Sequence, residues 1–445
     1  MKRTVIVIGG GASGMMAAIH AARAGAKVTI LEHTDRVGKK ILSTGNGKCN
    51  MTNLYQSEEC YRSRNRQFPF RVIEKYPVKD TLEFFEGLGI LVKNKNGYIY
   101  PNSEQASSVL DVLRMEVERL RIQVICGCEV SEIRVENGHG FAVKTSCGVF
   151  DGERLILAAG SKAAPGTGSD GSGYELARNL GHTVITPLPA LVQLRCQEKH
   201  YKQLAGIRTE ARLTLYVDGK ETDVQTGELQ LTDYGISGIP TFQLSRYASI
   251  ALYEALFEKR KVTVRIDFLP QQTVEETKTY LESRRRRMGE KTAEEWMTGL
   301  LNKKLSGVLL KLAGISLGER MADVDNRRWS ALLKQIKEYE TVVTASNPYE
   351  NAQICCGGVD TREVWPDTLE SRLVPGLYLV GELLDVDGIC GGYNLQWAWS
   401  SGALAGMDAA GGQKRYEKGP EMTPRRPKAG KKPGASQKKT GRGKS

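Results

Sequence analysis

The chain has 445 residues, of which 40% are hydrophobic and 26% charged, and its formal net charge is +12. This apolar content excludes disorder over the whole length, and the 48 glycines show no collagen-like period of three. Charged or polar residues interrupt every apolar run before the ~18 residues that a membrane helix needs. We therefore expect a globular protein of about two to four domains without a membrane segment.

The N-terminal residues and the cysteines indicate a cytoplasmic protein. Met1-Lys2-Arg3 runs directly into an apolar strand, so we expect no signal peptide. The nine cysteines include no CxxC pair, which argues against a zinc ribbon or a thioredoxin-type redox pair. Their odd number over a long chain fits reduced thiols. We expect no metal site.

The segment from Met1 to Glu32 matches a dinucleotide-binding βαβ unit. Two apolar runs, Thr4–Ile8 and Lys27–Leu31, are typical of buried parallel strands, and the small residues between them predict a helix. The segment Gly9–Gly14 carries a G-x-G-x-x-G motif, and Glu32 follows at the spacing that the dinucleotide-binding fingerprint requires of its acid. Strand, glycines, helix and acid together favour a nucleotide site over a tight turn that binds nothing.

Each part of this unit has a physical role. Gly9 permits a tight turn, Gly11 lets the backbone approach a pyrophosphate, and Gly14 lets the helix pack closely on the strand. The helix N-terminus presents free N–H groups and a positive dipole end to the phosphates. Glu32 would accept hydrogen bonds from an adenosine ribose.

Segment 38–50 reads as a glycine-rich loop, with Lys39, Lys40 and Lys48 adding positive charge. Its exposed N–H groups could wrap a pyrophosphate or approach a flat ring, and the alternative is a flexible surface loop. Beyond it the pattern predicts further elements: a helix with an apolar stripe from 106 to 120, strands at 122–125, 130–135, 141–145 and 154–158, and a turn at Asn137-Gly138.

The middle of the chain changes character. Alternating apolar and polar residues predict a β-rich unit over about 187–269, in which 227–238 runs from a strand into a glycine-rich turn. A helical pattern follows over 274–339, and we interpret Arg284–Arg287 as a solvated helix face. Segment 377–382 reads as a buried strand, and a small-residue helix is expected to begin near Asn394.

The C-terminal segment accounts for most of the net charge. Residues 413–445 contain 12 Lys and Arg and two acids, so this tail carries +10 and the rest of the chain +2. The tail is rich in Lys, Gly, Pro and Ser and is predicted to be disordered. If nucleic acid binds, we expect it to bind only through this tail.

Several motifs together resemble the HI0933-type flavoproteins, a NAD(P)/FAD-dependent family also called the aminoacetone oxidase family. They are Gly9–Gly14, Ser43–Asn53, Leu157–Gly173, Gly235–Pro240, Cys356–Val359 and Gly381–Gly402. The resemblance implies an α/β protein with a glutathione-reductase-like, FAD-binding Rossmann domain. That domain is discontinuous, formed by 1–189 and 346–412, with an inserted β-rich subdomain at 190–270 and a helical one at 271–345.

The resemblance also implies which residues bind FAD. The glycine motif would take the pyrophosphate, Glu32 the ribose, and the helix near Asn394 the flavin ring. The implied set is Gly9, Gly11, Ala12, Ser13, Gly14, Glu32, His33, Lys40, Gly45, Asn46, Gly47, Val130, Ala159, Gly160, Gly381, Glu382, Asp385, Gly392, Asn394 and Leu395.

The resemblance implies an FAD-dependent oxidoreductase acting on a small molecule. The favoured reaction is reduction of a conjugated ketone, a 3-oxo-Δ4/Δ6 steroid or bile-acid-like enone, with NADH or NADPH as a transient donor. The alternatives are a flavin amine oxidase and an RNA-associated flavoprotein. Tyr393, Tyr234 and Cys49 are the candidate proton donors, and the oligomeric state stays open.

Overall fold

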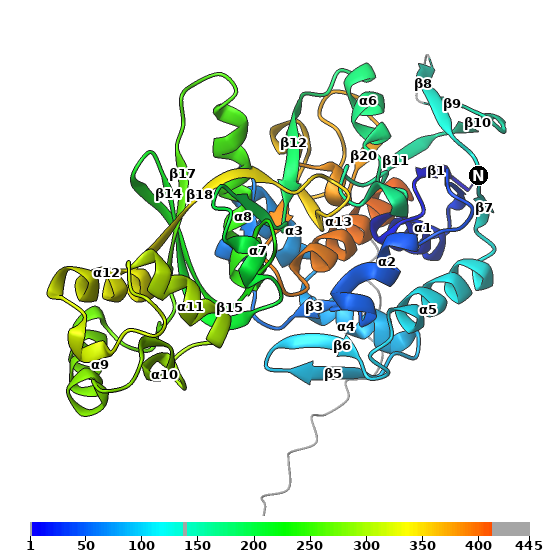
Figure 1. Cartoon of the computed structure of the whole chain (residues 1–445). Coiled ribbons are helices and arrows are strands. Elements are labelled where there is room, and N and C mark those ends of the chain that lie inside the picture. The colour runs from blue at the N-terminus through cyan, green and yellow to red at the C-terminus, as the bar shows by residue number, and fades with distance from the viewer. Residues whose placement is uncertain (1, 137–139, 412–445) are drawn as a thin grey trace, which may run out of the picture. The chain divides into compact units, whose positions relative to one another are not determined.

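A five-stranded parallel sheet in the order β20–β11–β1–β2–β7 carries the predicted nucleotide-binding unit (Figure 1). The computed structural model describes residues 2–136 and 140–411. The predicted basic tail and the Asn137-Gly138 turn lie outside these residues. The strands are β1 (Thr4–Ile8), β2 (Lys27–Leu31), β7 (Gln123–Ile125), β11 (Arg154–Leu157) and β20 (Leu377–Leu379).

Two helices far apart in the sequence pack against each other beside this sheet. They are α1 (Ala12–Arg23) and α13 (Tyr393–Ala409). A Cβ atom added at Gly402 would lie 2.4 Å from the Ser13 carbonyl oxygen, and one at Gly406 would lie 2.2 Å from that of Ala17. Only glycine permits so close an approach of the two helix backbones. The small residues that predicted a tightly packed helix therefore serve this contact.

Smaller elements surround the sheet and include the predicted helix with the apolar stripe, α5 (Ala106–Arg119), whose stripe is buried. The glycine-rich segment 38–50 is not wholly a loop, because it begins with a short helix, α2 (Lys39–Ser43). The other elements are α3 (Gln67–Lys75), α4 (Val78–Gly87), α6 (Ser172–Asn179), β3 (Thr52–Asn53), β4 (Tyr61–Arg62), β5 (Val92–Lys95), β6 (Tyr98–Pro101), β8 (Val130–Glu136), β9 (Gly140–Thr145), β10 (Gly148–Gly152), β12 (Val184–Ala190), β19 (Ile354–Val359) and β21 (Asp387–Gly388).

The inserted segment contains a closed barrel in the order β13–β16–β15–β14–β17–β18. Its strands are β13 (Leu194–Cys196), β14 (Arg208–Val217), β15 (Lys220–Leu231), β16 (Gly235–Gly238), β17 (Val262–Asp267) and β18 (Tyr339–Ser346). The glycine-rich end of 227–238, predicted to be a turn, forms strand β16. The segment predicted to be helical ends in β18, which pairs with β13 and β17 and closes the barrel.

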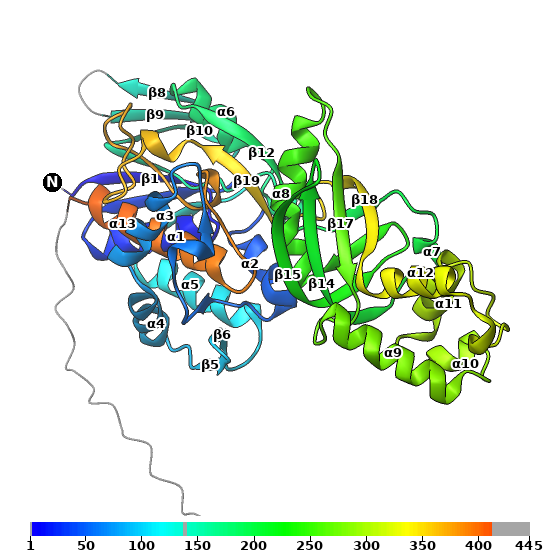
Figure 2. The same ribbon diagram turned by 90° about the vertical axis from the view of Figure 1, so that its left-hand side faces the viewer.

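The predicted helices follow β17, and Figure 2 shows the barrel strands between them and the Rossmann sheet. They are α9 (Val274–Met288), α10 (Ala293–Met297), α11 (Lys303–Leu312) and α12 (Asn326–Lys337). Two of the four consecutive arginines are not a solvated face. Arg284 donates to the Trp296 carbonyl oxygen at 2.7 Å, and Arg285 donates to that of Met321 at 3.0 Å. Within the described residues, no helix is both long and apolar enough to cross a membrane.

Candidate functional site

A cavity of about 580 Å³ opens at the carboxyl ends of the Rossmann strands. The loops that follow β1, β2, β11 and β20 all contribute to its lining, at Gly9, Glu32, Ala159 and Glu382. Open α/β sheets bind their ligands at this edge. The volume lies in the range of small-molecule and cofactor sites. The inserted segment also lines the cavity, through the first turn of helix α8 (Ile239–Glu254).

The β1–α1 turn has the geometry that its glycine spacing predicts. Gly9 has a φ of +98°, and a Cβ there would lie 2.5 Å from the Ala158 carbonyl oxygen. A Cβ at Gly14 would lie 1.9 Å from the Gly9 carbonyl oxygen, so this glycine serves the packing of helix on strand. A Cβ at Gly11 would meet nothing within 4 Å. Gly11 lines the cavity and leaves room there for a ligand.

Helix α1 presents an uncapped N-terminus to the cavity. Its N-cap residue is Gly11, no side chain caps the first turn, and that turn contains no acidic residue. Ala12 and Ser13 line the cavity next to it. Free N–H groups and the positive end of the helix dipole at such a position favour a phosphate.

Glu32 lies at the end of β2 and is buried. Its two carboxylate oxygens accept hydrogen bonds from the N–H groups of Gly10 and Thr34, both at 2.8 Å. These bonds hold the carboxylate between the glycine turn and the loop after β2. Nδ1 of His33 lies 3.4 Å from Oε1 of Glu32, and Val130 of β8 lines the same end of the cavity.

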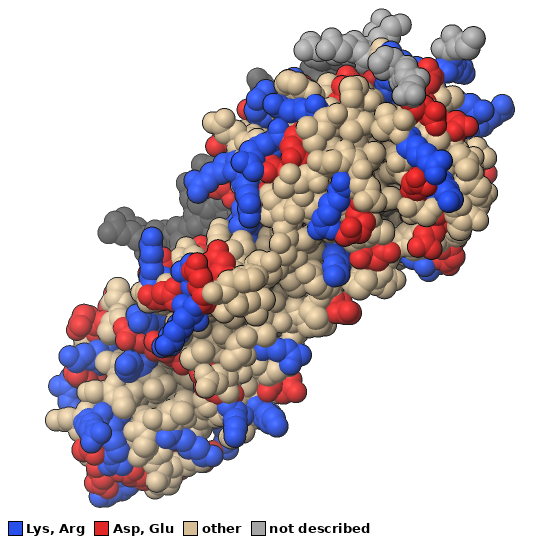
Figure 3. Space-filling view, turned by 90° about the horizontal axis from the view of Figure 1, so that it is seen from above, with Lys and Arg blue, Asp and Glu red and all other residues tan. Residues whose placement is uncertain are grey.

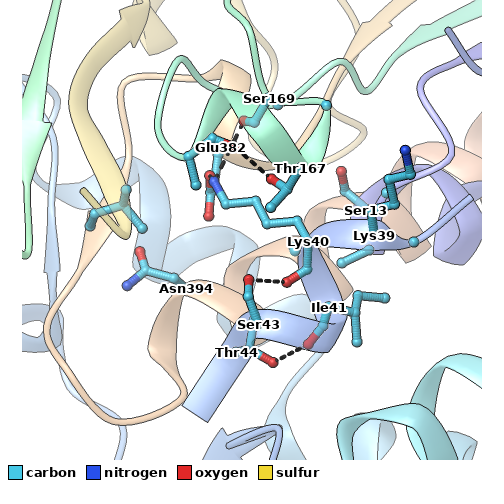
Figure 4. A pocket seen from close by; sticks show the side chains of 18 of the residues that line it. Ser13, Lys39, Lys40, Ile41, Ser43, Thr44, Thr167, Ser169, Glu382 and Asn394 are labelled. Atoms are coloured by element: carbon cyan, nitrogen blue, oxygen red, sulfur yellow. Dashed lines mark hydrogen bonds and ion pairs between the residues drawn. The ribbon is translucent and has the colours of Figure 1, made fainter. Parts of the chain in front are cut away.

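The lysines of the glycine-rich segment are paired with acids. Nζ of Lys40 lies 2.6 Å from Oε2 of Glu382, and Figure 4 shows the Lys40 side chain extending from α2 toward Glu382 and Ser169. Lys39 pairs with Asp35, and Lys48 lies 3.4 Å from Glu104. Lys39 and Lys40 thus each have a carboxylate partner, whereas Lys48 shares Glu104 with Lys93 and Lys95. The helix N-termini are electropositive groups of the cradle, and Arg36 also lines the cavity.

A second helix N-terminus, that of α13, closes the other end of the cavity. Gly391 and Gly392 precede it with φ values of +121° and +94°, and no side chain caps it. The Asn394 amide donates to the Gly388 carbonyl oxygen at 3.0 Å and accepts from the Gly388 N–H at 2.7 Å. Asn394 thus fixes the loop in front of its own helix while it lines the cavity.

The sequence-predicted cofactor residues fall into two groups. Four do not line the cavity: Gly14, Gly47, Gly381 and Asp385. Of these, Gly381 packs against Ser13, and burial raises the pKa of Asp385, which accepts from the Arg64 N–H at 2.9 Å. The structure brings the others together around the cavity: Gly9, Gly11, Ala12, Ser13, Glu32, His33, Lys40, Gly45, Asn46, Val130, Ala159, Gly160, Glu382, Gly392, Asn394 and Leu395.

None of the three candidate proton donors lines this cavity. Cys49 and Tyr393 are buried, and the Tyr393 ring packs edge-on against Tyr61. The Tyr234 hydroxyl accepts a hydrogen bond from the Asn347 amide at 3.1 Å, beside the barrel. The tyrosine that lines the cavity, within the described residues, is Tyr100 of β6.

Iodoacetamide at pH 8 is expected to leave Cys49 unmodified in the folded protein while it labels the exposed Cys147. Burial raises the pKa of Cys49 to about 12, and the reactive thiolate is scarce below the pKa. Peptide mass spectrometry after a timed quench measures both sites. Rapid labelling of Cys49 with loss of activity would instead support a thiol proton donor.

The apolar end of the cavity was missed by sequence reasoning. Phe242 of α8 packs with Leu191 and Ile354 in one apolar cluster, and Ile239 and Ile389 also line the cavity. Gly238-Ile239-Pro240 carries the available signal, because proline is frequent at the start of a helix and here follows a strand. The sequence pattern predicted a glycine-rich turn at the end of 227–238, and the cavity lining begins one residue later, at Ile239.

The residues that line the cavity fit an FAD molecule. Gly11 leaves space for a pyrophosphate, and the α1 N-terminus is uncapped. Glu32 is an acid held in place at the end of β2, where the dinucleotide-binding fingerprint has its ribose-binding acid. The second helix N-terminus and the glycines before it offer backbone N–H groups to a flat ring. Together, the fold and this site define an FAD-dependent oxidoreductase.

Comparison with known proteins agrees with this class. Residues 3–408 match the sequence model of the family described as HI0933-like protein Rossmann domain. The chain therefore belongs to that family. It is 44% identical over 406 residues to the 3-dehydro-bile acid delta(4,6)-reductase of Clostridium scindens, covering 91% of this chain and 98% of that protein. It is 32% identical over 402 residues to the ribosomal RNA dihydrouridine synthase of Haemophilus influenzae, covering 89% and 96%. A solved flavocytochrome c3 fumarate reductase aligns with a TM-score of 0.46 and 15% identity, covering 92% and 78%.

Proposed function

We propose that this protein reduces a carbon–carbon double bond conjugated with a ketone, in a 3-oxo-Δ4/Δ6 steroid or bile-acid-like substrate, with NADH or NADPH as electron donor. The observation that carries the proposal is the continuous cavity that joins the dinucleotide cradle to an apolar end. The 44% identical relative is named for reduction of a bile acid, a fused-ring substrate of this kind.

Different parts of the chain are proposed to bind the cofactor and the substrate. Residues 1–189 and 346–412 are proposed to form the FAD-binding domain. Glu32 would bind the ribose, the α1 N-terminus the pyrophosphate, and the α13 N-terminus the flavin edge that carries negative charge when reduced. FAD supplies hydride transfer between donor and acceptor. The apolar wall from the insertion excludes water from the substrate.

Anaerobic reduction of the yellow protein tests this function. We expect NADH or NADPH to bleach the flavin absorbance, and a 3-oxo-Δ4 steroid to restore it with formation of the saturated ketone. The matched control is the same steroid without the double bond, which should restore nothing. The proposal would be overturned if neither NADH nor NADPH bleached the flavin and the enone did not reoxidise the reduced flavin. Bleaching by an amine, with peroxide released in air, would indicate an amine oxidase.

A second candidate function follows from the 32% identical relative, named as a ribosomal RNA dihydrouridine synthase. The uracil C5–C6 double bond is conjugated with the C4 carbonyl, so its reduction is the same kind of chemistry. On the face shown in Figure 3, the described Lys and Arg side chains are interspersed with Asp and Glu. RNA binding favours clustered basic residues. Dihydrouridine in an rRNA transcript after incubation, measured by nucleoside mass spectrometry, with no steroid turnover would favour this candidate.

A further inference from the structure

We infer that the first turn of helix α8 is the part of the protein that selects a fused-ring apolar substrate, through Ile239 and Phe242. This inference rests on the proposed function and names residues that would set its specificity. The helix belongs to the inserted segment, while the dinucleotide cradle belongs to the Rossmann part. Both line the same cavity.

The junction between β16 and α8 directs the first turn of α8 toward the cavity. Gly238 ends β16 with a φ of +95°, and a Cβ there would lie 2.3 Å from the Glu228 carbonyl oxygen. This geometry requires glycine and fixes the direction in which α8 starts. Ile239 is the first helical residue, and it is 61% exposed although it lines the cavity. A substrate would cover that apolar surface.

One face of α8 is anchored to the loop that leads to α13. Residues 239, 242, 243 and 246 are spaced so that they share a helix face. The Cys390 N–H donates to Oε1 of Gln243 at 3.0 Å, and Nε of Arg246 lies 2.8 Å from Oδ2 of Asp387. These contacts hold Ile239 and Phe242 in place over the cavity, so the turn is a fixed wall.

The chemistry of the wall indicates the class of ligand that would cover it. Phe242 packs with Ile354 in one apolar cluster, Ile239 and Ile389 line the same cavity, and these side chains offer no hydrogen bond. An apolar ring system gains free energy from burial against them. A uracil base carries hydrogen-bonding groups on its edges, and bases extruded from RNA are recognised by hydrogen bonds to those edges. The wall therefore favours a steroid-like enone over a nucleobase.

Steady-state kinetics with two enones of different size test the inference. For Ile239→Ala and Phe242→Ala we expect KM for the 3-oxo-Δ4 steroid to rise about tenfold or more, because small losses of apolar contact in a pocket change specificity to this extent. The ratio of kcat/KM for the steroid to that for cyclohex-2-enone should fall by a similar factor. Leu256→Ala is the control, because Leu256 is 75% exposed and does not line the cavity.

The outcomes separate this inference from the proposed function. If the unchanged enzyme turns over the steroid and both variants keep its KM and the specificity ratio, the inference is overturned and the function stands. If kcat/KM for both enones falls equally, the turn has a structural role and the inference is overturned. If no enone reoxidises the unchanged enzyme, the function fails. Steroid binding, read as a shift of the oxidised flavin spectrum in the unchanged protein and both variants, then decides the inference.

Discussion

Gly11→Val is expected to weaken FAD binding strongly while the protein stays folded. The backbone of Gly11 is extended, with a φ of −76°, so valine can adopt it without strain. The added side chain has no protein atom within 4 Å of its Cβ and projects into the cradle beside the α1 N-terminus. Filling a close-fitting site in this way should weaken FAD binding about 100-fold or more.

Two further variants make this result specific. Gly318→Val is the matched control, because a Cβ there also meets nothing within 4 Å and the residue lies outside the cavity. Gly9→Ala should instead disturb folding, since its Cβ would overlap the Ala158 carbonyl oxygen. Flavin content after purification, FAD titration of the apoprotein and circular dichroism measure the three cases. A yellow Gly11→Val protein with unchanged affinity would contradict the assignment of the cradle.

Arg246→Leu is expected to lower the free energy of unfolding by about 3–5 kcal/mol, because it leaves a buried carboxylate without its partner. The Asp387 side chain is 3% exposed, and both of its oxygens accept from Nε of Arg246. Burial raises the pKa of Asp387 even beside the guanidinium. Urea unfolding at fixed pH measures the loss.

The pH dependence and a second substitution test the cause. Without Arg246 the pKa of Asp387 rises further, so the folded variant takes up a proton more readily than the unfolded chain. Its stability should therefore recover as the pH falls from 8 towards 5. Asp387→Asn in the variant should restore part of the loss. Arg320→Leu, which removes an exposed pair with Asp323, should change nothing measurable. If the loss of unfolding free energy in Arg246→Leu depended neither on pH nor on the Asp387→Asn substitution, this explanation would be wrong.

The β1–α1–β2 unit was predictable because its signals are local. The apolar strand, the glycine spacing and the acid all lie between Met1 and Glu32, and their physical roles do not depend on distant segments. The same holds for the α13 N-terminus, which follows Gly391 and Gly392 directly. Short-range geometry determines both.

Contacts between distant residues could not be predicted in this way. Lys40 is paired with Glu382, which is 342 positions away, and this pairing removes the free charge expected of the loop. Strand β18 closes the barrel against β13, although the whole helical part of the insertion lies between the barrel's other strands and β18 in the sequence. Arg285 bonds to a carbonyl oxygen at position 321. Side-chain type alone does not reveal such partners.

The packing of α13 on α1 has a consequence for how the protein is made on the ribosome. The β1–α1 turn, which we propose binds the pyrophosphate, is among the first parts of the chain to be synthesised. Helix α13, which packs on α1 at Gly402 and Gly406, is among the last of the described residues. A nascent chain that ends before Tyr393 lacks one of the two helix N-termini that we propose bind FAD. We therefore expect flavin binding to follow the docking of α13 on α1.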